Sequence, residues 1–249
     1  VKTRDPHLDR FAADVDLSIT SVKGSLDIPL HPGKSSIMIA GRRTFYDILS
    51  QVFGKGETEL VNFYSTNLLW IFKPNRKNNF RMHIFSEGDY MGLKEHDVSL
   101  KLSEVKKSQK GASLNWTHGF SEKTTNSITF WYSTYVADLV EEKRVPDNLS
   151  YRYEFRAPLH DVGFKNTLNW EMDQHWRLSG GVEYGFHHFD SGRFQGDEEG
   201  AHFSHMSYKK LMAQEISTFA SGKWSSGPMQ LEVGLRNNIY STDKKTFIA

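Results

Sequence analysis

The sequence predicts an all-β protein, an antiparallel up-and-down β-barrel that spans a membrane. Three observations predict this fold class. Apolar residues recur at alternate positions along most of the chain, which is the period of a β-strand rather than of a helix. The expected strands are about ten or more residues long, close to the ~9–11 residues of a tilted transmembrane strand. Short polar turns alternate with longer polar stretches, an asymmetry that transmembrane barrels share.

The composition excludes several other classes of protein. The chain has 249 residues with 31 basic and 30 acidic side chains, so its net charge of +1 gives no basic field for nucleic acid. Without cysteine there can be no disulfide, thiolate nucleophile or cysteine-ligated metal. The longest aliphatic and aromatic run, Leu68–Phe72, is far shorter than the roughly 20 residues of a membrane-spanning helix. A hydrophobic content of 38% still allows a membrane barrel, because only alternate residues of each strand face lipid.

The alternation that defines the strands is clearest after residue 175. Trp176 and Val182 share one side of this segment, and Arg177 and Glu183 share the other. The same pattern recurs along the chain and predicts about eleven strands. They lie near residues 11–20, 22–30, 35–45, 60–73, 79–91, 110–120, 127–138, 161–171, 175–189, 212–224 and 229–241.

The remaining segments are predicted to be connections, with one short helix among them. The helix covers Tyr46–Phe53 and is stopped by Gly54. The segment Leu149–Phe155 is either a further hairpin or an extension of the eighth strand. Short turns are expected at residues 31–34, 74–78, 121–126, 172–175 and 225–228, and long polar connections at about 46–59, 92–109, 139–160 and 190–210. The strands should therefore form a meander with tight turns at one end and long loops at the other.

The cost of placing charge in lipid predicts which side of each strand faces the membrane. An Arg or Lys that faces lipid at mid-depth costs roughly 2–4 kcal/mol, so the side with Arg177 and Glu183 should line the interior. Aromatic residues near strand ends are typical of interfacial girdles. The candidates for such a girdle are Trp70, Trp116, Trp131, Trp170, Trp176 and Trp224. Alternation alone also fits a soluble lipocalin-like or sandwich protein, and that alternative stays open.

Several motifs, in order along the chain, resemble a known family. Gly24–Leu30 and, after a short turn, Lys34–Leu49 with its pair Arg42 and Arg43 resemble the second and third barrel strands of TonB-dependent outer-membrane receptors that carry an early arginine pair. Val1–Asp5 is similar to the end of that family's plug domain. Further resemblances lie at Asp161–Lys165, Gly180–Tyr184, Ala213–Ile216 and Gly234–Arg236. Position 45 is Phe where Tyr is expected, and Leu26–Pro29 lacks the Glu-Gly often found before the proline.

The resemblance implies a 22-stranded barrel plugged by an N-terminal domain, of which this chain would hold about half. Residues 1–10 would be the end of the plug and residues 11–249 the N-terminal half of the barrel. The implied function is TonB-dependent import of a nutrient across a Gram-negative outer membrane, without enzymatic activity or a cofactor. The implied partners are TonB, through the plug region, a surface lipoprotein lid, and outer-membrane lipid including lipopolysaccharide. A barrel that only scaffolds an envelope complex is the alternative.

Arg42 and Arg43 are the residues most specific to the resemblance. Arg42 follows Met38 and Ala40 on the interior side and is expected to meet a carboxylate of the plug. Arg43 is expected to point outward near the upper rim, where its guanidinium can reach the interface.

No catalytic or metal site is predicted elsewhere in the sequence. Four histidines and several carboxylates lie between residues 187 and 205, but His187 and His188 point to opposite faces of a strand and cannot chelate together. Ser179 lies within a strand and not on the strand-to-helix turn of a hydrolase nucleophile. Five lysines at or near residues 94–110 read as a solvated loop that could also meet lipopolysaccharide or a lipoprotein.

Overall fold

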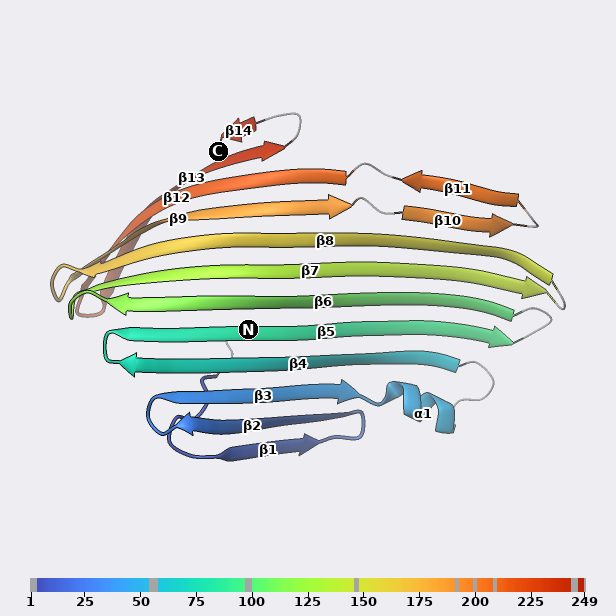
Figure 1. Cartoon of the computed structure of the whole chain (residues 1–249), viewed down its shortest axis with the longest axis horizontal. Coiled ribbons are helices and arrows are strands. Elements are labelled where there is room, and N and C mark those ends of the chain that lie inside the picture. Colours follow the sequence, from blue (N-terminus) through green and yellow to red (C-terminus); the bar gives the residue numbers. More distant parts are fainter. Residues whose placement is uncertain are drawn as a thin grey trace.

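The computed structural model describes residues 4–53, 58–96, 100–145, 148–190, 193–198, 201–207, 210–242 and 246–248. These residues form one antiparallel sheet of 14 strands with one helix (Figure 1). The sheet order follows the chain, except that β9 pairs with β12 while β10 pairs with β8 and β11. The elements are β1 (Ala12–Leu17), β2 (Ser21–His31), β3 (Ser35–Thr44), α1 (Tyr46–Phe53), β4 (Thr58–Asn75), β5 (Asn78–His96), β6 (Leu100–Gly119), β7 (Thr124–Val145), β8 (Asn148–Glu171), β9 (Trp176–Asp190), β10 (Arg193–Glu198), β11 (Ala201–Ser207), β12 (Lys210–Ser226), β13 (Met229–Thr242) and β14 (Thr246–Ile248).

The all-β, up-and-down fold predicted from the sequence is confirmed. The eleven expected strands correspond to β1–β9, β12 and β13, and the expected helix coincides with α1. The five short turns lie together at one end of the sheet (Figure 1). Two of them contain a glycine with positive φ, Gly33 (73°) and Gly227 (54°), a conformation that glycine adopts without the steric cost of a Cβ. Within the described residues, no helix is both long and apolar enough to cross a membrane.

The predicted long connections are mostly wrong, because the strands continue through them. Residues 92–109 belong largely to β5 and β6, and residues 139–160 largely to β7 and β8. Leu149–Phe155 is an extension of the eighth strand. The stretch 190–210 contains the hairpin of β10 and β11, and β10 pairs with β8. Charged residues made these stretches look like loops, but they alternate along strands and pair across them.

The strand register divides the side chains between two faces. Directly paired residues of antiparallel strands point to the same side. Met38 pairs with Asp27 and Leu69, and we call this side the inner face and the opposite side the outer face. Met38, Leu69 and Ile71 form a small buried cluster on the inner face, against which Leu8 of the N-terminal segment packs.

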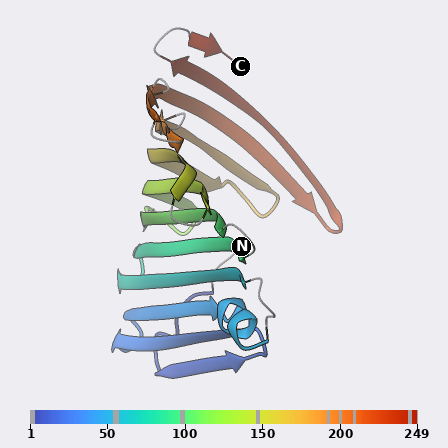
Figure 2. The same ribbon diagram turned by 90° about the vertical axis from the view of Figure 1, so that its right-hand side faces the viewer.

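The sheet is a single curved layer with two edges. Among the described strands, β1 pairs only with β2, and the other edge is formed by β13 and the short β14. Seen from the side, the turn ends of β9, β12 and β13 curve toward the side on which the N-terminus lies (Figure 2). The inner face is therefore the concave one near the turns.

Candidate functional site

The N-terminal segment is fixed to the inner face by a buried carboxylate. Asp27 has no exposed side-chain surface. Its Oδ2 accepts hydrogen bonds from Nη1 of Arg4 at 2.6 Å and from the backbone N–H of His7 at 3.0 Å, and it lies 2.6 Å from Nδ1 of His7. The hydrogen bond to Asp27 raises the pKa of Arg4 above its already high usual value, so this guanidinium stays charged. Residues 4–8 are thus held against β2 by charge-assisted hydrogen bonds.

Backbone and ionic contacts extend this attachment beyond Asp27. The carbonyl oxygen of Leu8 accepts a hydrogen bond from the N–H of Gly33 at 2.8 Å. Asp5 forms an ion pair with Arg81 of β5. The segment therefore contacts strands on both sides of the Met38 cluster. The sequence carries no signal that singles out Asp27, because a single Asp in a strand looks like any other polar residue of the inner face.

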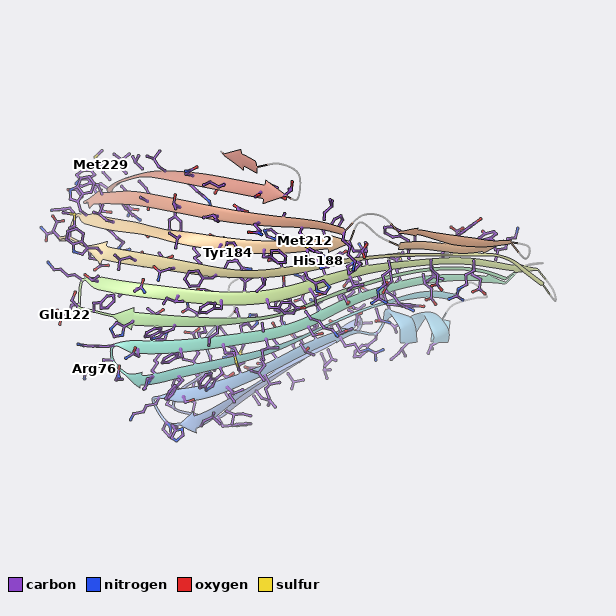
Figure 3. The ribbon with its side chains drawn as sticks, turned by 45° about the horizontal axis from the view of Figure 1, so that its top comes forward. Arg76, Glu122, Tyr184, His188, Met212 and Met229 are labelled. Atoms are coloured by element: carbon purple, nitrogen blue, oxygen red, sulfur yellow. The ribbon has the colours of Figure 1, made fainter. Side chains whose placement is uncertain are left out.

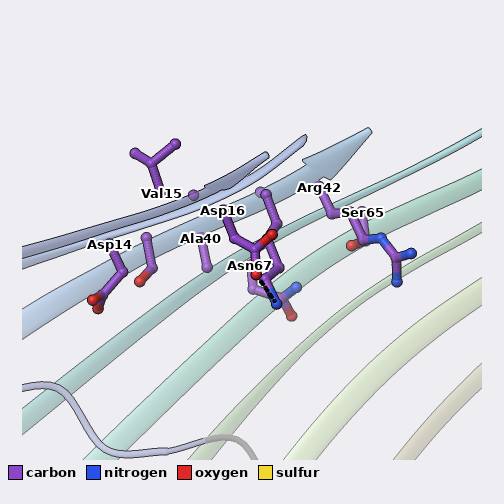
Figure 4. A pocket seen from close by; sticks show the side chains of 11 residues that line it. Asp14, Val15, Asp16, Ala40, Arg42, Ser65 and Asn67 are labelled. Carbon is purple, nitrogen blue, oxygen red and sulfur yellow. Dashed lines mark ion pairs between the residues drawn. The ribbon is translucent and has the colours of Figure 1, made fainter. Parts of the chain in front are cut away.

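A cavity lies beside this attachment on the inner faces of β1–β4. Its volume is about 490 Å³, and Figure 4 shows its lining side chains. Arg42 lines the cavity, and its guanidinium carbon lies 5.6 Å from the centre of the Phe63 ring. Asp16 pairs with Lys23 at 3.0 Å, and Asp14 also lines the cavity. The cavity thus presents both charges together with hydroxyl and amide groups.

The two arginines singled out by the sequence lie on opposite faces. Arg42 pairs with Lys23 and Ser65 on the inner face, and Arg43 pairs with Val22 and Tyr64 on the outer face. This is the orientation expected from the alternation. A plug carboxylate as the partner of Arg42 stays a prediction.

A second charged group lies on the inner face of β8, β9, β12 and β13. Glu183 lies 3.2 Å from Nζ of Lys165 and 3.6 Å from Nη2 of Arg236. The same guanidinium approaches Glu215 at 3.7 Å and donates to Oγ of Ser217 at 2.9 Å. Ser217 has no exposed surface. These side chains show why Glu183 and Arg236 belong on the inside, as the cost of charge in lipid predicts.

The outer face carries a broad apolar belt that nothing in the described structure covers. Its residues come from nearly every strand and are 41–83% exposed. The belt includes Leu26, Ile39, Ile84, Leu114, Phe130, Val162, Leu168, Val182, Ile216, Leu231, Val233 and Leu235. An exposed apolar surface of this extent indicates contact with lipid or protein.

Five of the six tryptophans predicted for a girdle lie on the outer face, near the turn end. They are Trp70, Trp116, Trp170, Trp176 and Trp224. Trp131 corrects the prediction, because it pairs with Ser113 and Gly163 on the inner face and its Nε1 donates to Asp161 at 3.1 Å. Proximity to a strand end suggested the girdle, whereas strand parity places Trp131 on the side opposite to Phe130 and Tyr132.

Above the belt the polarity of the two faces is reversed. On the inner face, one row of the register is entirely apolar from β4 to β8. It consists of Val61, Met91, Val105, Leu139 and Phe155. The outer face at this level carries ion pairs instead, with Arg152 bound to Glu142 and Glu154 and with Lys106 bound to Glu104. These extended strands are visible on the right in Figure 1.

The two described histidines that were candidates for a metal site, His187 and His188, lie on opposite faces of the sheet. His187 pairs with Asp161 on the inner face, at 2.9 Å, whereas His188 stacks on His160 on the outer face. Among the described residues, no group of three His, Cys, Asp or Glu side chains is arranged to hold a metal ion. His202 and His205 lie where side chains fall outside the described part.

Comparison with known proteins shows which solved structures share this fold. No protein-family profile matches the sequence, and no curated protein is significantly similar to it. The sheet superimposes on the copper transporter OprC with a TM-score of 0.64 and 11% identity, covering 96% of this chain and 39% of OprC. It matches FpvA of P. aeruginosa, solved with a pyoverdine–iron complex, with a TM-score of 0.63 and 12% identity over 99% of this chain and 39% of FpvA.

A third structure shares the fold: the ferric yersiniabactin uptake receptor FyuA of Yersinia pestis, with a TM-score of 0.54 and 10% identity, covering 92% of this chain and 48% of FyuA. The three structures are TonB-dependent receptors with a β-barrel, and they are transporters rather than enzymes. The chain therefore has the fold of part of such a barrel wall, and it spans less than half of the length of each of these proteins.

Proposed function

We propose that this chain is part of the barrel of a TonB-dependent receptor that imports a nutrient across a bacterial outer membrane. The observation that carries the proposal is the division of one continuous sheet into an exposed apolar outer face and a charged inner face. A bilayer solvates the first, and a water-filled or plugged lumen solvates the second. The low identity to OprC, FpvA and FyuA supports the fold alone, so the transported nutrient is not assigned.

The attachment of residues 4–8 to the inner face supports a plug that is continuous with the barrel. In this proposal residues 1–10 are the end of the plug domain, and force applied to the plug through TonB is resisted at Asp27. Arg42 and the adjacent cavity line the path that a partly displaced plug would open. The cavity carries basic, acidic and neutral polar groups, which suit a hydrophilic substrate that needs hydrogen bonds on entry.

The apolar inner row above the belt favours a surface lipoprotein lid as a partner. Met91 and Leu139 of this row are about half exposed, although they face the lumen side where polar residues are expected. A lid whose apolar side chains pack against the inner face of the extended strands would cover Met91 and Leu139. Met91→Asp and Leu139→Asp together should abolish co-purification with the lid. The matched pair Asp138→Asn and Glu154→Gln, on the outer face, should leave it unchanged.

Membrane fractionation and uptake test the main proposal. The full-length protein should partition with the outer membrane, and its deletion should abolish TonB-dependent uptake of one nutrient in a transport screen. Uptake that persists without TonB, together with correct membrane location, would favour the scaffolding alternative. Recovery in the soluble fraction without detergent would favour a soluble β-rich protein.

A further inference from the structure

One row of hydrogen-bond donors crosses the outer face where the apolar belt ends. The strand register places its five members side by side on β5–β9. They are Ser86, Lys110, Thr134, His160 and His188. The neighbouring outer-face row on the turn side is almost entirely apolar. It consists of Ile84, Ala112, Tyr132, Val162 and Phe186.

The height of this donor row fits the outer boundary of a bilayer. Trp170 stands at the turn end of β8 and His160 in the row, ten residues apart on the same face. At ~3.3 Å per residue this is roughly 33 Å along the strand. A strand tilt of about 40° reduces it to roughly 25 Å, the height of the apolar band of outer-membrane barrels. The donor row therefore lies at the level of lipid headgroups.

The donor row contains one lysine, Lys110, and no carboxylate. Lys110 is exposed, and in the described part of the chain no acidic group lies within ion-pair distance of it. Farther from the belt the cations are already neutralised, Lys106 by Glu104 at 2.8 Å and Arg156 by Asp138 at 3.5 Å. The charge of Lys110 is thus left for an anion outside this sheet.

The imidazoles of the row also have unused hydrogen-bonding capacity. His160 and His188 stack with ring centres 6.0 Å apart, and Nδ1 of His160 lies 3.2 Å from the hydroxyl of Tyr132. Nε2 of His188 is buried from water and has no hydrogen-bond partner among the described residues. Figure 3 shows His188 beside Met212 on this part of the sheet.

We propose that the donor row binds the phosphate of a phosphorylated membrane lipid, with Lys110 as its main charge and the two histidines and hydroxyls as further donors. The inference rests on the proposed membrane location. A lipid phosphate fits better than a free phosphate, because the donors are spread along the belt edge and the adjoining apolar rows match acyl chains. Each basic residue at an anionic membrane surface contributes about 1 kcal/mol, which corresponds to about a fivefold change in affinity.

Lipid binding by the full-length purified receptor tests this proposal. Phosphatidylcholine vesicles with and without bisphosphorylated lipid A are the probe, and bound lipid A is measured by native mass spectrometry. Lys110→Gln should weaken binding of lipid A about fivefold, and the further changes His160→Asn and His188→Asn should weaken it more. The matched control is Lys107→Gln, because Lys107 lies on the inner face of the same strand and should have no effect.

Three results would overturn the proposal. One is equal binding of lipid A by the Lys110→Gln and Lys107→Gln variants. Another is equal retention of lipid A from which the phosphates have been removed. Full competition by millimolar inorganic phosphate would identify free phosphate as the ligand. Membrane fractionation is scored separately, so a protein that reaches the outer membrane but fails these tests refutes the lipid site and leaves the proposed function intact.

Discussion

The guanidinium of Arg4 lies 2.6 Å from the carboxylate of Asp27, which is completely buried beneath the N-terminal segment. Replacing this carboxylate by a neutral amide, Asp27→Asn, removes the charge that both Arg4 and His7 contact. Hydrogen bonds to charged groups are worth about 1.5–3 kcal/mol. The free energy needed to detach the segment from the sheet should therefore fall by about that amount. Limited proteolysis within residues 4–10 should accelerate at least about tenfold, since 1.4 kcal/mol is a tenfold change.

Asp14 provides the control for this variant. It also contacts Arg4, but at 3.4 Å and with a side chain that is 76% exposed. An exposed ion pair of this kind contributes about 0–1 kcal/mol. Asp14→Asn should therefore change the cleavage rate little. Equal acceleration in the two variants would show that Asp27 does not hold the segment.

Gly163 is predicted to tolerate substitution poorly. A Cβ at this position would overlap the indole ring of Trp131, which packs over it. Gly163→Ala must displace the ring and break its hydrogen bond to Asp161, and overpacking of this kind costs about 1–3 kcal/mol. Urea unfolding in detergent should show this loss. Gly41→Ala, where the nearest atom lies 3.7 Å from the new Cβ, should be nearly neutral.

Sequence periodicity predicted the sheet well because one physical rule, alternate burial, acts over the whole of each strand. It predicted strand ends poorly beyond the apolar belt. There Lys106 and Glu104, or Arg152 and Glu142, look like loop residues, yet they form ion pairs on one face of continuing strands. Parity alone was enough to place Arg42 inside. The role of Asp27 could not be predicted, because it depends on a segment that is distant in sequence and folds back over the sheet.

Ser217 is predicted to be a structural centre of the charged group on β9, β12 and β13. Its buried hydroxyl donates to Glu215 at 3.0 Å and accepts from Arg236 at 2.9 Å. Ser217→Ala leaves both charged partners with an unfilled hydrogen bond, at a cost of about 1–3 kcal/mol. The urea midpoint of unfolding should fall accordingly. Ser221→Ala, four residues farther along the same face of β12, should lower the midpoint far less.

Arg42 is predicted to act in plug binding and Arg43 to be dispensable for it. Arg42→Ala removes a cation from the cavity on the inner face, whereas Arg43→Ala removes one from the outer face. In the full-length receptor, Arg42→Ala should lower uptake several-fold without loss of barrel assembly, measured by heat-modifiable electrophoresis. If Arg43→Ala lowers uptake as much, the effect is not specific to the inner face.

The turn between β8 and β9 should make the stability of the sheet sensitive to acid through Asp173. Its Oδ1 accepts hydrogen bonds from the backbone N–H groups of His175 at 2.7 Å and Trp176 at 2.8 Å, and these bonds lower the pKa of Asp173. A carboxyl with a lowered folded-state pKa stabilises the fold above its unfolded pKa of about 3.9, and this contribution is lost as the pH falls through the folded value. Asp173→Asn retains an acceptor oxygen and removes the titrating group. Near neutral pH the variant should keep both hydrogen bonds of the turn, so its urea midpoint should lie close to that of the parent. Between pH 5 and pH 2 the urea midpoint should fall less in the variant than in the parent. A midpoint that falls equally in both proteins would show that this turn does not contribute to the acid sensitivity.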